Sequence, residues 1–282
     1  MRTKPFNKRV SVLLPFYSAD KLKDLCLSIK SIAGQTYGGL EVVLVQDGPV
    51  PGEMQRAVSD IVASDERIVL IKNDRNLGLK DSLNKAMSKA TGEYIARQDA
   101  DDVSAPDRIE KQIRKMEQDN LDILGTWFYE LNTKTGKNEF RKMPVSPQEI
   151  KNTLPVTSPF CHGSVMFRKD AVKGLGGYQA PFPNDDYELW WRAYVKGLKM
   201  ANLPEPLYTL RIDPDSYFKR RRGLKMSFAE TGLRFKIVKE GKYPLRYYFA
   251  ALLAFFLRLL PSRILEIVYS LKNRMFGSVR NV

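Results

Sequence analysis

The sequence contains only two cysteines, Cys26 and Cys161, and a single histidine, His162. The cysteines are far apart and follow no Cys-x-x-Cys or Cys/His spacing. A disulfide framework and a structural zinc site are therefore not expected, and a reducing compartment fits. Internal repeats and low-complexity stretches are also missing, so a repeat architecture is not expected and nothing in the composition indicates disorder.

No apolar stretch reaches the roughly 20 residues that a membrane-spanning helix requires. The stretch from Tyr247 to Leu260 has fourteen residues, contains Arg258 and is followed by Pro261. The basic start of the chain leads into an alternating strand pattern instead of an apolar segment, so we expect no signal peptide.

Positive charge is unevenly distributed along the chain. Residues 219–282 contain fifteen lysines and arginines but three acidic residues, so this segment carries +12 of the net charge of +14. Apolar residues flanked by lysine and arginine are typical of helices that lie in a membrane interface. We therefore expect 219–282 to associate with an anionic membrane surface. Simple packing of these helices on the rest of the protein is the alternative.

The 282 residues allow one large domain with a smaller appendage. Short Val-rich or Ile-rich runs alternate with segments of helical periodicity, which predicts an α/β fold with a mostly parallel, doubly wound sheet. We expect a domain over 1–218, divided into halves 9–103 and 104–218, followed by the helical segment 219–282. The expected strands are Val10–Leu14, Leu40–Val45, Ile68–Ile71, Tyr94–Ala96, Asp122–Leu131 and Gly163–Phe167, and the expected helices are Lys21–Ile32, Pro51–Val62, Leu79–Ala90, Pro106–Asp119, Ser146–Thr153 and Asp185–Val195.

Polar side chains follow three of the expected strands. Tyr17, Asp47 and Asp99 all lie just beyond strand ends, where ligands bind in open α/β sheets. Asp99 and Asp101 are two positions apart, so side-chain alternation places them on one face of an extended segment. Hard divalent cations such as Mg²⁺ or Mn²⁺ bind one or two carboxylates plus substrate phosphates. These residues therefore predict a metal and phosphate site, with a polar helix cap as the alternative.

Several motifs occur together in one order along residues 9–212. The motifs are Val10-Ser-Val-Leu-Leu-Pro-Phe-Tyr17, Glu41-Val-Val-Leu-Val-Gln-Asp-Gly48, Asn76-Leu-Gly-Leu79, Gly92-Glu-Tyr-Ile-Ala-Arg-Gln-Asp-Ala-Asp-Asp102, Gly176-Gly-Tyr178 and Asp185-Asp-Tyr-Glu-Leu-Trp190. With these motifs the chain resembles the family 2 glycosyltransferases of the nucleotide-sugar-binding type A fold. Three further stretches resemble the branch of that family that builds bacterial exopolysaccharide and lipopolysaccharide, namely Gln46-Asp-Gly-Pro49, Pro106-Asp-Arg-Ile-Glu-Lys-Gln112 and His162-Gly-Ser-Val-Met-Phe167.

The resemblance implies roles on the donor side. Tyr17 would stack on the base of a nucleotide-diphosphate sugar and Asp47 would accept a hydrogen bond from that base, which favours a UDP-sugar. Asp99 would contact the ribose or the metal, and Asp101 would hold the metal. For Tyr17 the alternative is a buried loop aromatic, and for Asp47 the alternative is a turn residue before Gly48.

The resemblance also implies an acidic pair at the start of a helix, with Asp186 as general base and Asp185 orienting the acceptor. A carboxylate can take the proton of a sugar hydroxyl as the hydroxyl attacks, and a single in-line displacement inverts the anomeric carbon. Helix capping is the alternative role of the pair. His162 and Trp190 would line the acceptor side, although a structural role is equally compatible with a lone histidine.

The chain departs from the family pattern at two donor-phosphate positions. Leu83 stands where many relatives have arginine, and no histidine occurs in the stretch around Arg211. Lys80 or Arg75 is a candidate for the positive charge missing at Leu83, and Arg211 or the cluster Arg220–Arg222 is a candidate to replace the missing histidine. A Gln-x-x-Arg-Trp stretch typical of processive polymerases is also absent, which favours transfer of one sugar.

The resemblance therefore implies an inverting, metal-dependent hexosyltransferase that uses a lipid-linked or polysaccharide acceptor. We expect it in the cytoplasm, peripheral on the inner membrane, with no nucleic-acid partner. The alternatives are a catalytically inactive scaffold and a basic nucleic-acid-binding protein. A sugar nucleotidyltransferase is disfavoured because Pro15-Phe-Tyr-Ser18 is not a glycine-rich phosphate loop.

Overall fold

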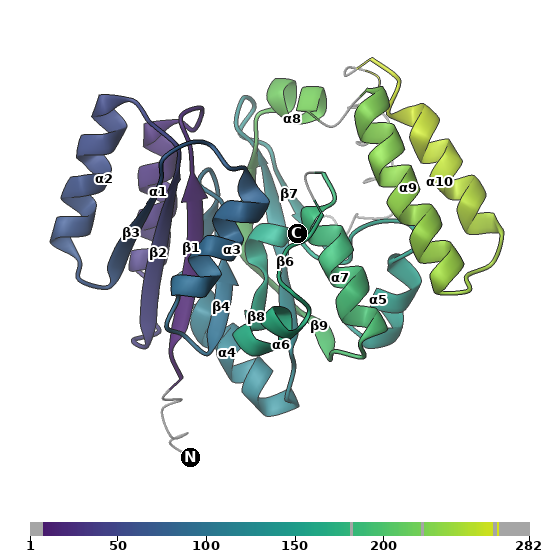
Figure 1. Ribbon diagram of the computed structural model, residues 1–282, viewed down its shortest axis with the longest axis horizontal. Coiled ribbons are helices and arrows are strands. Elements are labelled where there is room, and N and C mark those ends of the chain that lie inside the picture. Colours follow the sequence, from purple (N-terminus) through teal and green to yellow (C-terminus); the bar gives the residue numbers. More distant parts are fainter. Residues whose placement is uncertain (1–7, 181–182, 221–222, 262–263, 265–282) are drawn as a thin grey trace.

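The computed structural model describes residues 8–180, 183–220, 223–261 and 264. Within these residues a nine-stranded sheet runs through the molecule, with helices packed on both of its faces (Figure 1). The strand order is β3-β2-β1-β4-β8-β6-β9-β5, and β7 pairs with β6. The α/β fold class predicted from the sequence is confirmed.

The first four strands are parallel. β1 (Val10–Phe16) lies between β2 (Leu40–Asp47) and β4 (Tyr94–Arg97), and β3 (Ile68–Asn73) lies beyond β2. Every residue of β2 and all but one of β1 are buried, as expected for strands that helices cover on both faces. The carboxyl ends of these strands consequently meet at one edge of the sheet.

Two apolar cores lie on opposite faces of the sheet. Alternate strand residues supply them, so that Val12 and Leu14 enter one core and Leu13 enters the other. Helices α1 (Leu22–Ala33), α2 (Gly52–Ser64) and α4 (Arg108–Asp119) cover the first core, and α3 (Leu79–Lys89), α5 (Pro147–Thr153), α6 (Lys169–Gly174) and α7 (Asp185–Val195) cover the second.

The second half of the sheet is mixed in direction. β8 (Met166–Arg168) is antiparallel to β4 and to β6 (Ile123–Asn132), whereas β6 is parallel to β9 (Met200–Ile212). The short strands β5 (Val103–Ser104) and β7 (Asn138–Arg141) pair antiparallel with β9 and β6. One sheet thus connects both halves of the chain.

Two parts of this second half differ from the sequence prediction. The expected strand at Gly163–Phe167 begins too early, because residues His162–Ser164 form a short 3-10 helix, η1, that is closed by hydrogen bonds from Ser164 and Val165. The long strand β9 was not predicted. It contains Pro204 and Pro206, which normally argue against a strand, and its pairing with β6 is irregular there.

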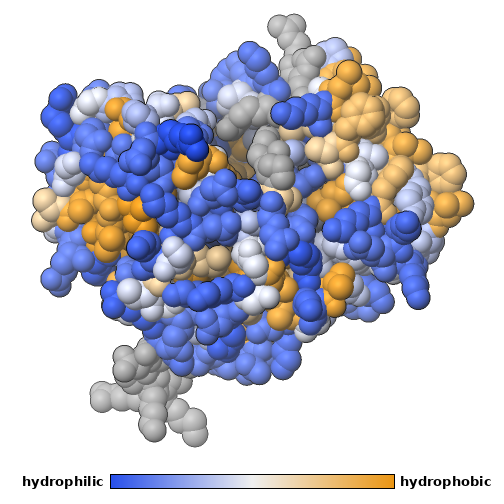
Figure 2. Space-filling view, in the orientation of Figure 1, coloured by the Kyte–Doolittle hydropathy of each residue, from blue (hydrophilic) through white to orange (hydrophobic). Residues whose placement is uncertain are grey.

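The basic segment after residue 213 is helical where the structure describes it. It forms α8 (Pro214–Arg220), α9 (Leu224–Glu240) and α10 (Arg246–Leu257), and α9 packs Leu233 and Ile237 into the second core. The outer surface of α9 and α10 remains apolar (Figure 2). The exposed apolar side chains are Leu224, Phe228, Leu245, Phe249, Leu252, Leu253 and Phe256.

The sequence continues with Ile264–Leu271, whose apolar pattern beside Arg263 and Lys272 predicts a second amphipathic helix. This stretch lies outside the described residues except for Ile264. Within the part of the chain that the structure describes, no helix combines the length and the apolarity that crossing a bilayer requires.

Two glycines give a matched test of the packing. A Cβ atom on Gly125 in β6 would lie 2.1 Å from Asn202 Oδ1 and 2.7 Å from Phe160 Cδ1, whereas Gly232 in α9 has open space around it. Gly125→Ala should lower the free energy of unfolding by about 1–3 kcal/mol through overpacking. Gly232→Ala should raise it by about 0.5–1 kcal/mol through helix propensity. Chemical denaturation measures both changes, and equal effects of the two substitutions would contradict this account.

Candidate active site

Asp47 holds the loop that follows β3. Its Oδ1 accepts hydrogen bonds from Asn73 Nδ2 at 2.9 Å and from the Leu77 backbone N–H at 2.8 Å, and its Oδ2 accepts from the Gly78 N–H at 3.0 Å. The side chain is almost buried, with 6% of the residue surface exposed. The side chain of Asp47 thus supports the 77–78 loop, which is not the turn at Gly48 considered as its alternative role, and its hydrogen bond to a base stays a prediction.

Tyr17 follows β1 at the same edge of the sheet. The residue is 38% exposed, and its backbone N–H donates to Asp20 Oδ2 at 2.9 Å. Tyr17 is thus not the buried loop aromatic considered as its alternative role. An exposed ring beside a strand end is available for stacking.

A buried guanidinium supports the acidic loop after β4. Arg97 has no exposed surface, and its Nη2 lies 2.5 Å from Asp99 Oδ1 while its Nη1 donates to the Leu13 and Gln98 carbonyl oxygens, each at 3.0 Å. Asp99 keeps 32% of its side chain exposed. This carboxylate is therefore both fixed in place and accessible from outside.

The neighbouring carboxylates of this loop differ in burial. Asp101 is exposed, whereas Asp102 is fully buried and accepts hydrogen bonds from the Tyr208 hydroxyl at 2.8 Å and from the Arg211 N–H at 2.7 Å. Burial, together with the nearby Asp101 and Asp99 charges, raises the pKa of Asp102 well above its usual value. Asp102 thus anchors the loop to β9, and Asp101 faces outward.

The two basic residues proposed for the donor phosphates lie in different surroundings. Arg211 lies beside the acidic loop, with its Nη1 2.8 Å from Asp24 Oδ1 and 3.1 Å from the Asp101 carbonyl oxygen. Lys80 is on α3 and pairs with Asp81 at 3.2 Å. Arg211 thus contacts the acidic loop, whereas Lys80 pairs with Asp81 of its own helix.

The candidate metal ligands fit a hard cation. Asp99 and Asp101 present carboxylates at a strand end, and a Mg²⁺ or Mn²⁺ ion commonly needs only one or two carboxylates when substrate phosphates complete its shell. Among the described residues, no group of three or more histidine, cysteine, aspartate and glutamate side chains forms a complete protein cage. The two carboxylates of Asp99 and Asp101 match the number that such an ion takes from a protein when substrate phosphates supply further ligands.

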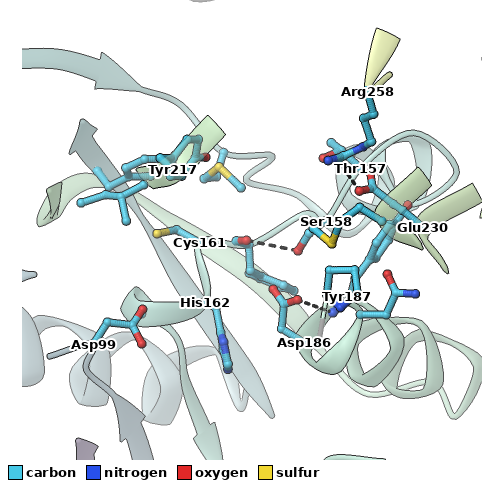
Figure 3. Close-up of a pocket in the computed structure, with 18 residues that line it drawn as sticks. Asp99, Thr157, Ser158, Cys161, His162, Asp186, Tyr187, Tyr217, Glu230 and Arg258 are labelled. Carbon is cyan, nitrogen blue, oxygen red and sulfur yellow. Dashed lines mark hydrogen bonds and ion pairs between the residues drawn. The ribbon is translucent and has the colours of Figure 1, made fainter. Parts of the chain in front are cut away.

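A cavity of about 300 Å³ joins this strand end to two more distant parts of the chain. Asp99 and His162 lie on one wall, and Asp186 projects from the start of α7 on another (Figure 3). Glu230 and Arg258, from α9 and the end of α10, lie on a third wall. Residues separated by more than 150 positions in sequence thus surround a single space.

The two acidic side chains at the start of α7 lie in different environments. Asp186 lines the cavity, and its Oδ1 accepts a hydrogen bond from the Tyr187 backbone N–H at 2.7 Å. Asp185 is buried, with 4% of its surface exposed, and is not among the lining residues. Asn184, which precedes both, donates to the Ala229 carbonyl of α9 at 2.8 Å. The helix end that presents Asp186 is thereby tied to α9.

His162 lines the cavity in its neutral form. Its Nε2 lies 2.9 Å from the Tyr178 hydroxyl and 3.4 Å from Arg97 Nε. Burial, with a further contribution from the Arg97 charge, lowers the pKa of His162 well below its usual value. A neutral imidazole can donate or accept a hydrogen bond, but it supplies no positive charge to a diphosphate.

The predicted acceptor contact of Trp190 is not compatible with its position. Its indole is fully buried and packs edge-on against Phe160, with ring centroids 5.2 Å apart, and near His162 at 6.1 Å. Trp190 therefore supports the cavity wall from behind and has no surface to offer an acceptor.

Sequence reasoning missed the buried polar residues beneath the loop. Arg108 donates to the Gly163 and Arg97 carbonyl oxygens at 3.0 and 2.9 Å, and Gln112 donates to the Leu124 and Ser164 carbonyl oxygens at 3.0 and 2.9 Å. The sequence holds a signal for them, because the Pro106–Gln112 stretch of the expected helix places Arg108 and Gln112 four positions apart. Its polar residues at helical spacing point inward and fasten α4 to the site.

The comparisons with known proteins agree with this geometry. Residues 11–176 match the family described as Glycosyl transferase family 2. The chain is 34% identical to the amylovoran biosynthesis glycosyltransferase AmsE of Erwinia amylovora over 261 residues, which cover 92% of this chain and 97% of that protein. It is 26% identical to the UDP-Gal:alpha-D-GlcNAc-diphosphoundecaprenol beta-1,3-galactosyltransferase of Escherichia coli, over 95% of this chain and 98% of that one.

A solved structure shows the same fold. The mannosyltransferase PcManGT from Pyrobaculum calidifontis, in complex with GDP-Man and Mn²⁺, superposes with a TM-score of 0.65 at 19% identity, covering 97% of this chain and 83% of that one. The nucleotide-sugar-binding type A fold that the resemblance implied is thereby confirmed. The family match spans more than half of the 282 residues, and the chain therefore belongs to glycosyl transferase family 2.

Proposed function

We propose that this chain transfers one sugar, with inversion, from a nucleotide-diphosphate sugar to a hydroxyl group of a lipid-linked glycan in the synthesis of a bacterial surface polysaccharide. The observation that carries the proposal is the shared cavity between Asp99 on the acidic loop and Asp186 on α7. One space thus offers a site for the leaving diphosphate and a carboxylate for the attacking hydroxyl.

The donor would bind along the carboxyl edge of β1, β2 and β4. Tyr17 offers an exposed ring for the base, and Asp47 keeps acceptor capacity beside its loop contacts, because each carboxylate oxygen has more than one lone pair. This pair favours a UDP-sugar. A divalent ion on Asp101 and Asp99 would neutralise the charge that develops on the leaving diphosphate.

Asp186 would act as the general base. It takes the proton of the acceptor hydroxyl while the hydroxyl oxygen bonds to the anomeric carbon and the bond to the diphosphate breaks. Attack from the face opposite the diphosphate inverts the anomeric configuration. Arg97 keeps Asp99 in place through this step, and Asn184 keeps the start of α7 attached to α9.

Two relatives support the substrate classes. One acts, by its name, on a diphosphoundecaprenol-linked sugar with a UDP-Gal donor, and the mannosyltransferase structure holds GDP-Man and Mn²⁺. We propose a lipid-linked acceptor for this chain and a location on the cytoplasmic face of the inner membrane. The 219–282 segment would attach it there, because exposed apolar side chains next to basic ones favour a lipid surface over a nucleic acid.

Substitutions of the two acids at the start of α7 distinguish a role in base catalysis from a role in helix capping. Asp186→Asn should lower kcat by about 10²–10⁴-fold, since an amide cannot take the proton, and should leave donor affinity unchanged. Asp185→Asn is the matched control and should affect kcat far less, because Asp185 does not line the cavity. Transfer of labelled sugar from UDP-sugars to a lipid-linked oligosaccharide fraction measures both variants. Comparable loss in the two, at equal thermal stability, would reject Asp186 as base.

The apolar surface of α10 gives a test of membrane attachment. Phe249 and Phe256 are 65% and 62% exposed. The double variant Phe249→Ser with Phe256→Ser should bind phosphatidylglycerol vesicles at least ~10-fold more weakly, because burying one such side chain contributes about 1.5 kcal/mol or more. Leu27→Ser with Val69→Ser changes two exposed apolar residues elsewhere and should have little effect. Vesicle co-sedimentation measures the partitioning, and equal binding by both double variants would refute the proposed attachment surface.

A further inference from the structure

The C-terminal helices do more than cover the domain, because they form part of the cavity. Met226 and Glu230 of α9 and Arg258 at the end of α10 lie on its wall, opposite the acidic loop (Figure 3). A segment predicted only to attach the protein to a membrane thus reaches the space where the acceptor would bind.

The guanidinium of Arg258 is held at this wall by an ion pair. Glu230 pairs with Arg258 and, through its other carboxylate oxygen, with Arg234 of the same helix. The side chain of Arg258 keeps 23% of its surface exposed. Because a guanidinium carries five N–H donors in a planar fork, a second anion can bind while the Glu230 pair persists.

Arg258 differs in charge from the other groups around the cavity. Asp99, Asp186 and Glu230 are acidic, and His162 is held neutral. Among the described lining residues, Arg258 is the only one that carries a positive charge. An anionic group entering on the acceptor side would therefore be attracted to this position.

The placement of Arg258 on α10 relates it to the apolar surface. Phe249, Leu252, Leu253 and Phe256 are exposed and recur at a spacing of three and four residues, so they form one stripe along the helix. Arg258 lies nine positions after Phe249, about 180° around the helix at 100° per residue. The stripe faces outward, and Arg258 faces the cavity.

A lipid surface against the stripe would therefore lie about one helix diameter, roughly 10 Å, from Arg258. The interfacial layer on each side of a bilayer is on the order of 5–8 Å thick, so Arg258 would lie near the level of the lipid phosphates, and a sugar attached to such a phosphate would extend into the cavity. Long basic side chains beside an apolar surface commonly place their charge at the headgroup level.

We propose that Arg258 binds the diphosphate that joins the acceptor sugar to its lipid carrier. This inference rests on the proposed transfer to a lipid-linked acceptor. Arg258 would position the acceptor by a charge-assisted, bidentate contact, and α10 would thereby act as a membrane contact on one face and a substrate contact on the other.

The test is binding of farnesyl diphosphate to the full chain in neutral detergent micelles, with EDTA present so that the metal-dependent donor site does not compete. Wild type should bind farnesyl diphosphate more tightly than farnesol or inorganic pyrophosphate. Arg258→Gln should weaken farnesyl diphosphate binding about tenfold, the effect of losing hydrogen bonds to a charged group. Arg246→Gln removes an exposed charge at the other end of α10 and should leave the affinity unchanged.

The variant Glu230→Gln distinguishes a role of Arg258 in substrate binding from a purely structural role of its ion pair with Glu230. Removing this negative charge should keep or tighten farnesyl diphosphate binding, whereas a structural pair would make Glu230→Gln and Arg258→Gln equally harmful. Equal weakening of the two, or unchanged binding by Arg258→Gln, would overturn the proposal. Weaker UDP binding by Arg258→Gln with Mn²⁺ present would also overturn it, by assigning Arg258 to the donor. If the wild type did not bind a UDP-sugar with Mn²⁺ present, that result would instead refute the proposed function.

Discussion

The ion pair between the buried Arg97 and the partly exposed Asp99 is the interaction on which the site depends. Taking a guanidinium out of water costs several kcal/mol unless hydrogen bonds and a counter-charge offset it, and here the Leu13 and Gln98 carbonyl oxygens and the Asp99 carboxylate do so. The same contacts fix the direction in which Asp99 faces. Burial lowers the pKa of the nearby Arg108 to about 10, so this side chain stays charged at neutral pH. Its charge is likewise stabilised by hydrogen bonds to backbone carbonyl oxygens.

The rest of the site is assembled around this fixed loop. Asp102 joins the loop to β9, and the η1 segment that carries His162 lies directly beside it, since a Cβ atom on Gly163 would be 2.7 Å from Asp99 Oδ2. The opposite wall comes from α7, which Asn184 links to α9. The C-terminal helices therefore support the position of Asp186 as well as contributing Arg258. The proposed base and the helices proposed to contact a membrane therefore belong to one connected structure.

Much of the first half could be predicted from sequence because its signals are local. Val-rich runs locate β1 and β2 to within about two residues, and the acidic pair at the start of α7 marks a helix that begins where expected. The strand-end positions of Tyr17, Asp47 and Asp99 follow from that pattern alone. These features depend on neighbours in the chain and on the general location of ligands in α/β sheets.

The failures have non-local causes. β9 was not predicted because Pro204 and Pro206 normally argue against a strand. The strand forms nevertheless, because its pairing with β6 is irregular at these prolines. The contact of Arg211 with Asp24 joins residues 187 positions apart, and no spacing rule reveals it. Burial of Trp190 likewise depends on Phe160, which arrives from another segment.

The proposed function requires that the acidic loop bind a nucleotide diphosphate through a divalent ion, next to a separate base. Calorimetry of UDP binding, with Mn²⁺ and with EDTA, tests this requirement on wild type, Asp101→Ala and Asp186→Asn. Wild type should bind UDP only with Mn²⁺, Asp101→Ala should lose that binding, and Asp186→Asn should retain it. Binding of equal strength in EDTA, or in folded Asp101→Ala, would contradict it.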